Sequence, residues 1–253
     1  MKKFWFQTKI NLTRLIKRDI KTVFFALFFP IFFYILYTKV FVFEMPEAEM
    51  VIWQKDYMLS MIIFGSMFTL IITMANTLLE DYTNQFQLFV HLTPTSKWYY
   101  FLSINTVYIP INLTLILSLG LIAYLVNGVT LGVIDWVVLL FIILFGTIPF
   151  SLLGVIVSYG RKTTIVNLIG NLLVFPLAIV GGLWWPLEMM PSWIVSIGEQ
   201  LMTNKILVLS RDWVHSNQFN LTALLGIIFW ILGLVVAMIG VQKLFKYKES
   251  DIG

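Results

Sequence analysis

Six long apolar segments make up most of this 253-residue chain, and none has a charged residue in its middle. The hydrocarbon core of a bilayer is about 30 Å thick, and a helix needs about 20 residues to cross it. Each segment has about that length or more. Because the apolar residues run continuously instead of alternating with polar ones, the pattern predicts helices and not a β-barrel. The segments are Thr22–Phe43, Met58–Leu79, Trp98–Val126, Trp136–Ser158, Ile165–Leu183 and Leu221–Gln242. The chain is therefore predicted to be an all-α membrane protein with six transmembrane helices.

The composition agrees with this class. Hydrophobic residues make up 59% of the chain and charged residues 12%, whereas a soluble domain carries about 25% charged residues. Six spans leave little chain for a separate soluble domain, so we expect one membrane domain, residues 22–253, preceded by a short N-terminal segment, residues 1–21. The chain has no cysteine, which excludes disulfides and thiol chemistry.

Lysine and arginine are distributed unequally between the two sides of the six segments. Seven of the 17 basic residues precede the first segment, and six more fall on the same side. The positive-inside rule then predicts that both termini are cytoplasmic; a bacterial cell membrane is what the family resemblance described below implies. The sequence pI of about 9.2 follows from this rule and from attraction to anionic lipid headgroups, so it does not indicate nucleic-acid binding.

The first 21 residues are predicted to form an amphipathic helix in the cytoplasmic interface. At helical spacing, Trp5, Leu12, Leu15, Ile16 and Ile20 share one face, and most of the basic residues lie elsewhere. The alternative is that this basic segment only sets the orientation of the first span.

Two connections are longer than ordinary loops. The cytoplasmic one, residues 80–97, is amphipathic and ends near Thr93-Pro94. The external one, residues 184–220, begins after Gly181-Gly182 and contains four tryptophans and two prolines. Its apolar stretch is interrupted by polar residues, which makes it a poor seventh span. We therefore predict an external re-entrant helical hairpin with its tryptophans at headgroup level.

The sequence lacks the residues that nucleotide binding, proton transfer, metal binding or catalysis by this chain would need. The sequence has no G-x-x-x-x-G-K-[ST] phosphate loop. No ionisable residue lies deep in a predicted span, which argues against a proton relay. The two histidines, His91 and His215, are predicted on opposite sides of the membrane, so we expect neither a metal site nor a catalytic base.

Neutral polar residues do occur within the spans, and they could line a path for an amphipathic substrate. The alternative is hydrogen bonding between helices, worth about 0.6 kcal/mol on average, and it is favoured for any single residue. The candidates for path lining are Asn76, Asn105, Asn112, Asn167 and Asn171.

A chain without a nucleotide site or proton relay needs another source of energy, and its amphipathic cytoplasmic loop suits a docked partner. With these features, the chain resembles the ABC-2 permeases, the membrane subunits of ATP-binding-cassette exporters. The resemblance covers nearly the whole chain. It is carried by the basic N-terminal helix, the six spans, Glu80-Asp81 followed by Thr93-Pro94-Thr95-Ser96, and Gly181-Gly182-Leu183-Trp184-Trp185-Pro186 continuing to Pro191-Ser192-Trp193. Asn84-Gln85-Phe86-Gln87 stands where the family usually shows a Gly-Thr-Leu-Glu-like stretch.

The resemblance implies a specific assembly. Two permease chains, identical or homologous, would combine in lipid with two cytoplasmic ATPases, which bind the ATP and Mg²⁺. The substrate would be an antibiotic, drug, peptide or lipid-like molecule. Residues 80–97 would be the coupling segment that contacts the ATPase, through Glu80, Asp81, Phe86, Gln87, Leu88, Phe89, Leu92, Thr93 and Pro94. Residues 184–220, here called the hairpin segment, would be the external hairpin and loop, in which Trp184–Gln200 forms the re-entrant helices that close the outer gate. The gate residues would be Gly181, Gly182, Trp184, Trp185, Pro186, Pro191 and Trp193.

A different class remains open from the residues alone. A polytopic sensor or assembly scaffold would share the hydropathy pattern and would need no ATPase. A neighbouring gene for a protein with a phosphate loop would separate the two classes.

Overall fold

The computed structural model describes residues 2–41, 46–84 and 97–250, and all regular structure in these ranges is helical. The prediction of an all-α protein is therefore confirmed. The elements are α1 (Lys2–Ile35), a π-helical turn η1 (Leu36–Val40), α2 (Glu47–Phe68), a second π-helical turn η2 (Thr69–Thr73), α3 (Met74–Thr83), α5 (Lys97–Asn127), α6 (Val133–Gly146), α7 (Ile148–Ser158), α8 (Thr163–Val180), a short 3₁₀ turn η3 (Leu187–Met189), α9 (Ser192–Gly198), α10 (Met202–Ser216) and α11 (Leu221–Ser250).

Five helical stretches in the described ranges are long and apolar enough to cross a bilayer. They are Glu47–Thr83, Leu102–Asn127, Val133–Ser158, Thr163–Val180 and Leu221–Leu244. They correspond to the second to sixth predicted spans. The apolar part of the first, Ala26–Val40, is shorter, so the count of six spans stays a prediction.

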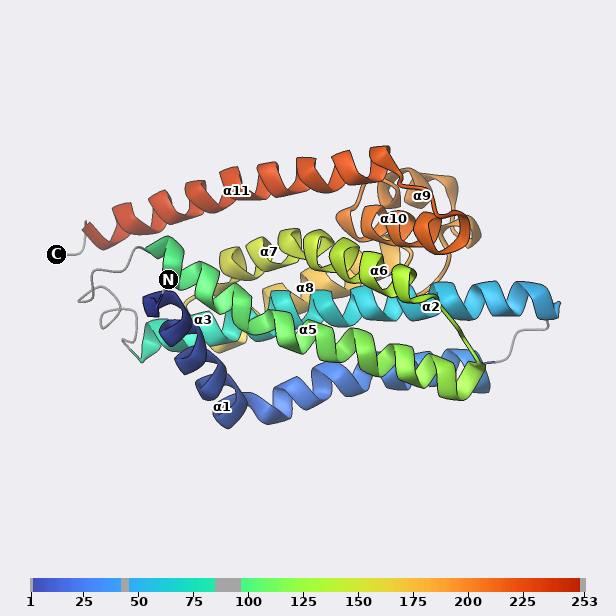
Figure 1. Cartoon of the computed structure of the whole chain (residues 1–253). Helices are drawn as coiled ribbons and strands as arrows, with labels where there is room; N and C mark the ends of the chain where they lie inside the picture. Colours follow the sequence, from blue (N-terminus) through green and yellow to red (C-terminus); the bar gives the residue numbers. More distant parts are fainter. Residues whose placement is uncertain (1, 42–45, 85–96, 251–253) are drawn as a thin grey trace.

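The first helix contains both the predicted interfacial helix, residues 1–21, and most of the first predicted span. α1 is continuous from Lys2 to Ile35, and Figure 1 shows a sharp bend between its first part and the remainder. The position of the first part relative to a membrane surface stays a prediction. Its side chains nevertheless contact the bundle, because Asn11 is buried and its Nδ2 donates to Ser103 Oγ on α5 at 3.1 Å.

The long helices run side by side along one direction (Figure 1). The first and last helical residues lie at the same end of this bundle, here called the termini end. The opposite end, here called the far end, carries α9, α10 and the beginning of α2. The last turn of α3 and the first turn of α5 lie at the termini end.

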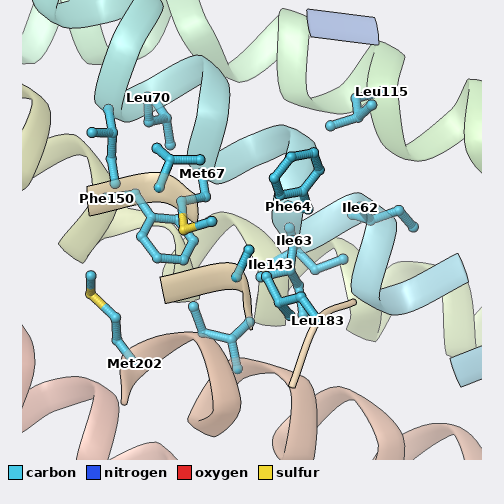
Figure 2. Close-up of a cluster of buried hydrophobic side chains, with 14 of the residues drawn as sticks. Ile62, Ile63, Phe64, Met67, Leu70, Leu115, Ile143, Phe150, Leu183 and Met202 are labelled. Carbon is cyan, nitrogen blue, oxygen red and sulfur yellow. The ribbon is translucent and has the colours of Figure 1, made fainter. Parts of the chain in front are cut away.

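One helix forms the centre of the bundle. α2, η2 and α3 are continuous over 37 residues, and 94% of their most apolar window is buried. They pack against α1, α5, α7, α8 and α10. Figure 2 shows Ile63, Phe64 and Met67 of α2 within one apolar cluster, together with Phe150 of α7 and Met202 of α10.

The π-helical turn η2 lies where α7 packs closely against the central helix. α7 packs against η2, and a Cβ atom on Gly154 would collide with the backbone carbonyl of Leu70. Small residues are typical of such close contacts between membrane helices, because association there depends on van der Waals packing. Only glycine fits at position 154 without moving one of the two helices.

Candidate functional sites

The predicted gate residues begin where α8 ends. Gly181 follows the last helical residue, and a Cβ atom on it would collide with Thr203 Oγ1 and the carbonyl of Leu177. Gly182 has φ +77°, a region that favours glycine, and a Cβ there would lie 3.0 Å from Leu187 Cγ. The two glycines thus allow a tight turn at the end of α8, and this turn packs closely against the start of α10.

The two prolines of the hairpin segment lie directly before short helices. Pro186 precedes η3, and Pro191 precedes α9. Both have extended backbone angles, and proline favours such positions because its φ is fixed and it cannot donate a backbone hydrogen bond. Two helices, α9 and α10, follow in this segment. Whether this pair re-enters a bilayer stays a prediction.

α10 is the part of the hairpin segment that is built into the bundle. It packs against α2, α6 and α11, and Met202, Ile206 and Leu207 are fully buried. Hydrogen bonds also fix the segment to α8 and α11. Thr203 Oγ1 donates to Leu177 O of α8 at 3.1 Å. Trp230 Nε1 of α11 donates to Gln200 O, between α9 and α10, at 2.8 Å.

The three tryptophans among the predicted gate residues have different surroundings. Trp184 is half-buried and lies among aromatic rings of three helices. Its ring centroid is 5.5 Å from that of Phe33 on α1, 5.6 Å from Phe64 on α2 and 5.8 Å from Phe175 on α8. Such ring pairs contribute about 0.5–1.5 kcal/mol each beyond their buried area. Trp185 and Trp193 are exposed, so Trp184 is the tryptophan that connects this segment to α1 and α2.

The coupling segment lies largely outside the described residues. Phe86, Gln87, Leu88, Phe89, Leu92, Thr93 and Pro94 fall in the range 85–96, outside what the structure describes. The two acids of the segment, Glu80 and Asp81, lie on the last turn of α3. Glu80 is half-buried and Asp81 is 1% exposed, and both have an interaction inside the chain. Of the two, Glu80 is therefore the acid more accessible to a partner.

The structure brings together two of the five asparagines proposed to line a path. Asn76 Nδ2 on α3 donates to Asn167 Oδ1 on α8 at 2.8 Å and to Ile72 O at 3.0 Å. Asn112 is buried and donates to Tyr108 O of its own helix at 3.0 Å. Asn105 is half-buried on the same helix, and Asn171 is exposed on α8. The bond between Asn76 and Asn167 is the interaction expected if these residues only join helices, although lining a path stays a prediction for all five.

This bond leads to a measurable expectation. In a double-mutant cycle with Asn76→Leu and Asn167→Leu, we expect a coupling energy of about 0.6 kcal/mol and at most about 1.7 kcal/mol, measured as stability in detergent. The control cycle pairs Asn76→Leu with Asn171→Leu, since Asn171 is exposed on the same helix, and should give a coupling near zero. Equal coupling in both cycles would contradict the hydrogen bond as the source.

Two polar contacts at the far end were not predicted from the sequence. Asn127 Nδ2, at the end of α5, donates to Tyr34 Oη at 2.9 Å and to Thr38 Oγ1 at 3.0 Å. Asp56 of α2 lies beside Arg211 and His215 of α10. The distribution of basic residues predicts that Asp56, Arg211 and His215 lie on the same side of the membrane. It does not predict that they meet, because the paired residues are up to 159 positions apart and no periodicity in the sequence indicates the contact.

The comparisons with known proteins agree with the family resemblance that the sequence showed. A family model described as "ABC-2 type transporter" matches residues 3–199. The matched range runs from α1 through α9 and includes the coupling segment and the first part of the hairpin segment. The chain is also similar to the protein named Putative transport permease YvfS from Bacillus subtilis (strain 168). The two are 30% identical over 189 residues, which is 74% of this chain and 76% of that protein.

Proposed function

This chain belongs to the ABC-2 type transporter family and is thus the membrane subunit of an ATP-binding-cassette transporter; from that premise we propose that it moves an amphipathic or hydrophobic molecule out of the cell. The observation that carries the proposal is the family match over residues 3–199. ATP and Mg²⁺ are bound by a separate ATPase subunit, because the sequence has no phosphate loop of its own. The substrate class is what the resemblance to the family implies, and the neutral polar residues within the spans could line a path for such a molecule.

The transporter is proposed to contain two permease chains, identical or homologous, and two ATPases. The exposed surface of α8 is an argument for a second permease chain. Only 22% of its most apolar window is buried, compared with 94% for the central helix. Leu168 and Leu172 are exposed on α8 together with Asn171. Leucines alone would suit lipid, but an asparagine amide facing hydrocarbon lacks hydrogen-bond partners that a second protein chain can supply.

The termini end is proposed to face the cytoplasm of a bacterial cell, and the far end to face outward. Thirteen of the 17 basic residues lie on the predicted cytoplasmic side. In this orientation the coupling segment contacts the ATPase, and the hairpin segment closes the path on the outer side.

The orientation is tested by cysteine labelling, for which the chain is suited because it has no cysteine of its own. Single cysteines in residues 46–56 or 205–218 should react with a membrane-impermeant maleimide added to whole cells. Cysteines next to Lys97 or Lys162 should react only after the cells are opened. Labelling of these last positions from outside would overturn the orientation.

The function itself is tested by purifying the tagged chain from its own host's membrane. We expect it to bring down a protein with a phosphate loop, and the purified complex in lipid should hydrolyse ATP faster when the transported molecule is present. An active assembly that contains no ATPase would contradict the proposal and favour a sensor or scaffold.

A further inference from the structure

The indole of Trp184 has a buried hydrogen-bond donor without an acceptor. Its Nε1 is buried, and no acceptor among the described residues forms a hydrogen bond with it. The indole of Trp230 shows the usual arrangement, since its Nε1 donates to the carbonyl of Gln200 at 2.8 Å. Buried tryptophans generally bind an acceptor in this way, because an unpaired N–H group loses the hydrogen bond that it made with water. The donor of Trp184 is thus left for a partner from outside the described residues.

The ring contacts of Trp184 provide at best a weak acceptor. The planes of Phe64 and Phe175 are inclined to the indole plane by 67° and 73°, so these rings meet it edge to face. An N–H group can point toward the face of an aromatic ring, but this contact is weaker than a hydrogen bond to oxygen. Phe33 lies closer to parallel, at 23°. An oxygen acceptor brought to this place would therefore bind the N–H group better than the rings do.

The aromatic cluster around Trp184 reaches the surface of the bundle. Phe175 of α8 and the neighbouring Trp185 both contact Trp184, and they are themselves 36% and 40% exposed. On the other side, Phe64 of α2 is fully buried. The indole of Trp184 thus lies between the core of the protein and rings that a molecule in the membrane or at its surface can contact.

A row of rings connects Trp184 with the outside of α1. Phe24, Phe28 and Phe32 are exposed and stack on one another with centroid distances of 5.7 and 5.9 Å. Phe32 contacts Phe33 at 5.8 Å, and Phe33 contacts Trp184. Aromatic rings pack well against flat, apolar bodies, while single polar groups fix the orientation of a ligand. These surroundings therefore favour an apolar ligand with aromatic rings and one oxygen acceptor for the indole.

From these contacts we propose that Trp184 is a specificity-determining residue, whose indole N–H donates to a carbonyl or ether oxygen of the transported molecule. The proposal rests on the proposed function, in which the hairpin segment closes the path on the outer side. Trp184 directly follows the turn at Gly181-Gly182, so a movement of the hairpin segment carries its indole. A molecule that supplies the missing acceptor shifts the equilibrium toward the position in which the donor is paired. The transported molecule thereby favours its own passage.

The first experiment observes the indole N–H groups in the full chain, without the ATPase. The chain is isotope-labelled at its nine tryptophans, placed in lipid nanodiscs and studied by NMR. The signals of Trp184 and Trp213 are assigned by their loss in Trp184→Phe and Trp213→Phe. Trp213 is the matched control: its Nε1 is also buried without an acceptor among the described residues, but its indole lies on α10, against Phe219.

The probes are benzophenone and diphenylmethane. Both carry two phenyl rings, and the first has a carbonyl group where the second has a methylene group. Benzophenone should shift the proton signal of Trp184 downfield, as a hydrogen bond to oxygen does, whereas diphenylmethane should not, and the signal of Trp213 should respond to neither. Equal responses to both probes, or equal responses of both tryptophans, would overturn the proposal. So would a Trp184 signal that is already downfield without a probe, because the donor would then be paired within the assembly.

A second measurement needs no variant and so does not depend on the folding of Trp184→Phe. On irradiation, the carbonyl oxygen of benzophenone takes a hydrogen atom from a neighbouring C–H bond, and the two carbon radicals then combine. In the unchanged chain, the covalent product should map to peptides that contain Phe33, Phe175 or Trp184. Products found only in other peptides would overturn the site.

The last experiment measures the consequence in the complete complex with its ATPase. The stimulation of ATP hydrolysis by benzophenone is divided by that of diphenylmethane, because this ratio cancels the general effect of an apolar molecule. It should be about two- to tenfold, the factor that corresponds to one neutral hydrogen bond. Trp184→Phe should lower the ratio to near one, and Trp213→Phe should leave it unchanged.

The outcomes separate the possible failures. A shifted Trp184 signal with a ratio near one in the unchanged complex would show that the indole binds the acceptor but does not select the substrate, which overturns the role in specificity. A ratio that survives in Trp184→Phe would overturn it as well. A purified assembly without an ATPase would instead contradict the proposed function and would leave the NMR measurement valid.

Discussion

Phe89→Asp should uncouple the transporter: the ATPase should dissociate from the permease, and substrate should no longer stimulate ATP hydrolysis. The coupling segment is the long amphipathic connection on the predicted cytoplasmic side. Burying one large apolar side chain in a partner contributes about 1.5–3 kcal/mol, and a carboxylate in its place adds a desolvation cost. Because 1.4 kcal/mol corresponds to a factor of ten in affinity, the complex should bind its ATPase at least about tenfold more weakly. Co-purification at graded ATPase concentrations measures this loss.

The control for this variant is Phe41→Asp, which makes the same chemical change at an exposed phenylalanine near the far end. It should insert into the membrane and keep its ATPase. The competing interpretation is that Phe86 and Phe89 only rest in lipid headgroups. In that case, Phe89→Asp would retain its ATPase and transport at the normal rate, and the assignment of the coupling segment would be wrong.

Gly182→Val should impair export without loss of the ATPase. Gly182 has φ +77°, and a Cβ there would lie 3.0 Å from Leu187 Cγ. A β-branched residue in this region costs on the order of 1–3 kcal/mol, and the contact with Leu187 adds to that. The chain would therefore leave α8 in another direction and move the hairpin segment. Transport into inverted vesicles measures the effect, and co-purification of the ATPase shows that the complex is intact.

The chain offers a matched control for the backbone strain alone. Gly128, in the connection between α5 and α6, also has a positive φ of +66°, but no atom lies within 4 Å of the position its Cβ would take. Gly128→Val should therefore lower stability by a similar amount and leave export largely unchanged. If both variants lose export equally, the loss reflects strain in general and not the position of the hairpin segment.

The sequence predicts the helices of this protein better than it predicts their contacts. Five spans follow from length and hydropathy, because a bilayer requires long apolar runs. The bonds that connect α10 to α2, α8 and α11 depend on single side chains such as Thr203, Trp230 and Asp56. Their partners are distant in the sequence, and no repeat marks them.

The dependence of contacts on single, distant side chains also explains which site residues the sequence could indicate. Gly181 and Gly182 were anticipated because they begin the external connection and belong to the stretch that resembles the family, whereas their tight turn is known only from the structure. Asn76 and Asn167 could be recognised as polar residues within spans, but only the structure shows that they meet. The placement of Trp184 with other tryptophans at headgroup level stays a prediction, and its contacts with Phe33, Phe64 and Phe175 could not be read from the sequence.

The continuity of the central helix has a mechanical consequence. α2, η2 and α3 form a rod of 37 residues, about 55 Å long at 1.5 Å per residue. One end carries Asp56 and the contact with α10, and the other leads directly into the coupling segment. If the coupling segment binds the ATPase as proposed, a displacement produced there reaches the proposed outer face as the movement of a single lever. The π-helical turn at Thr69–Thr73 interrupts the α-helical hydrogen bonding of that lever, so we expect it to flex there.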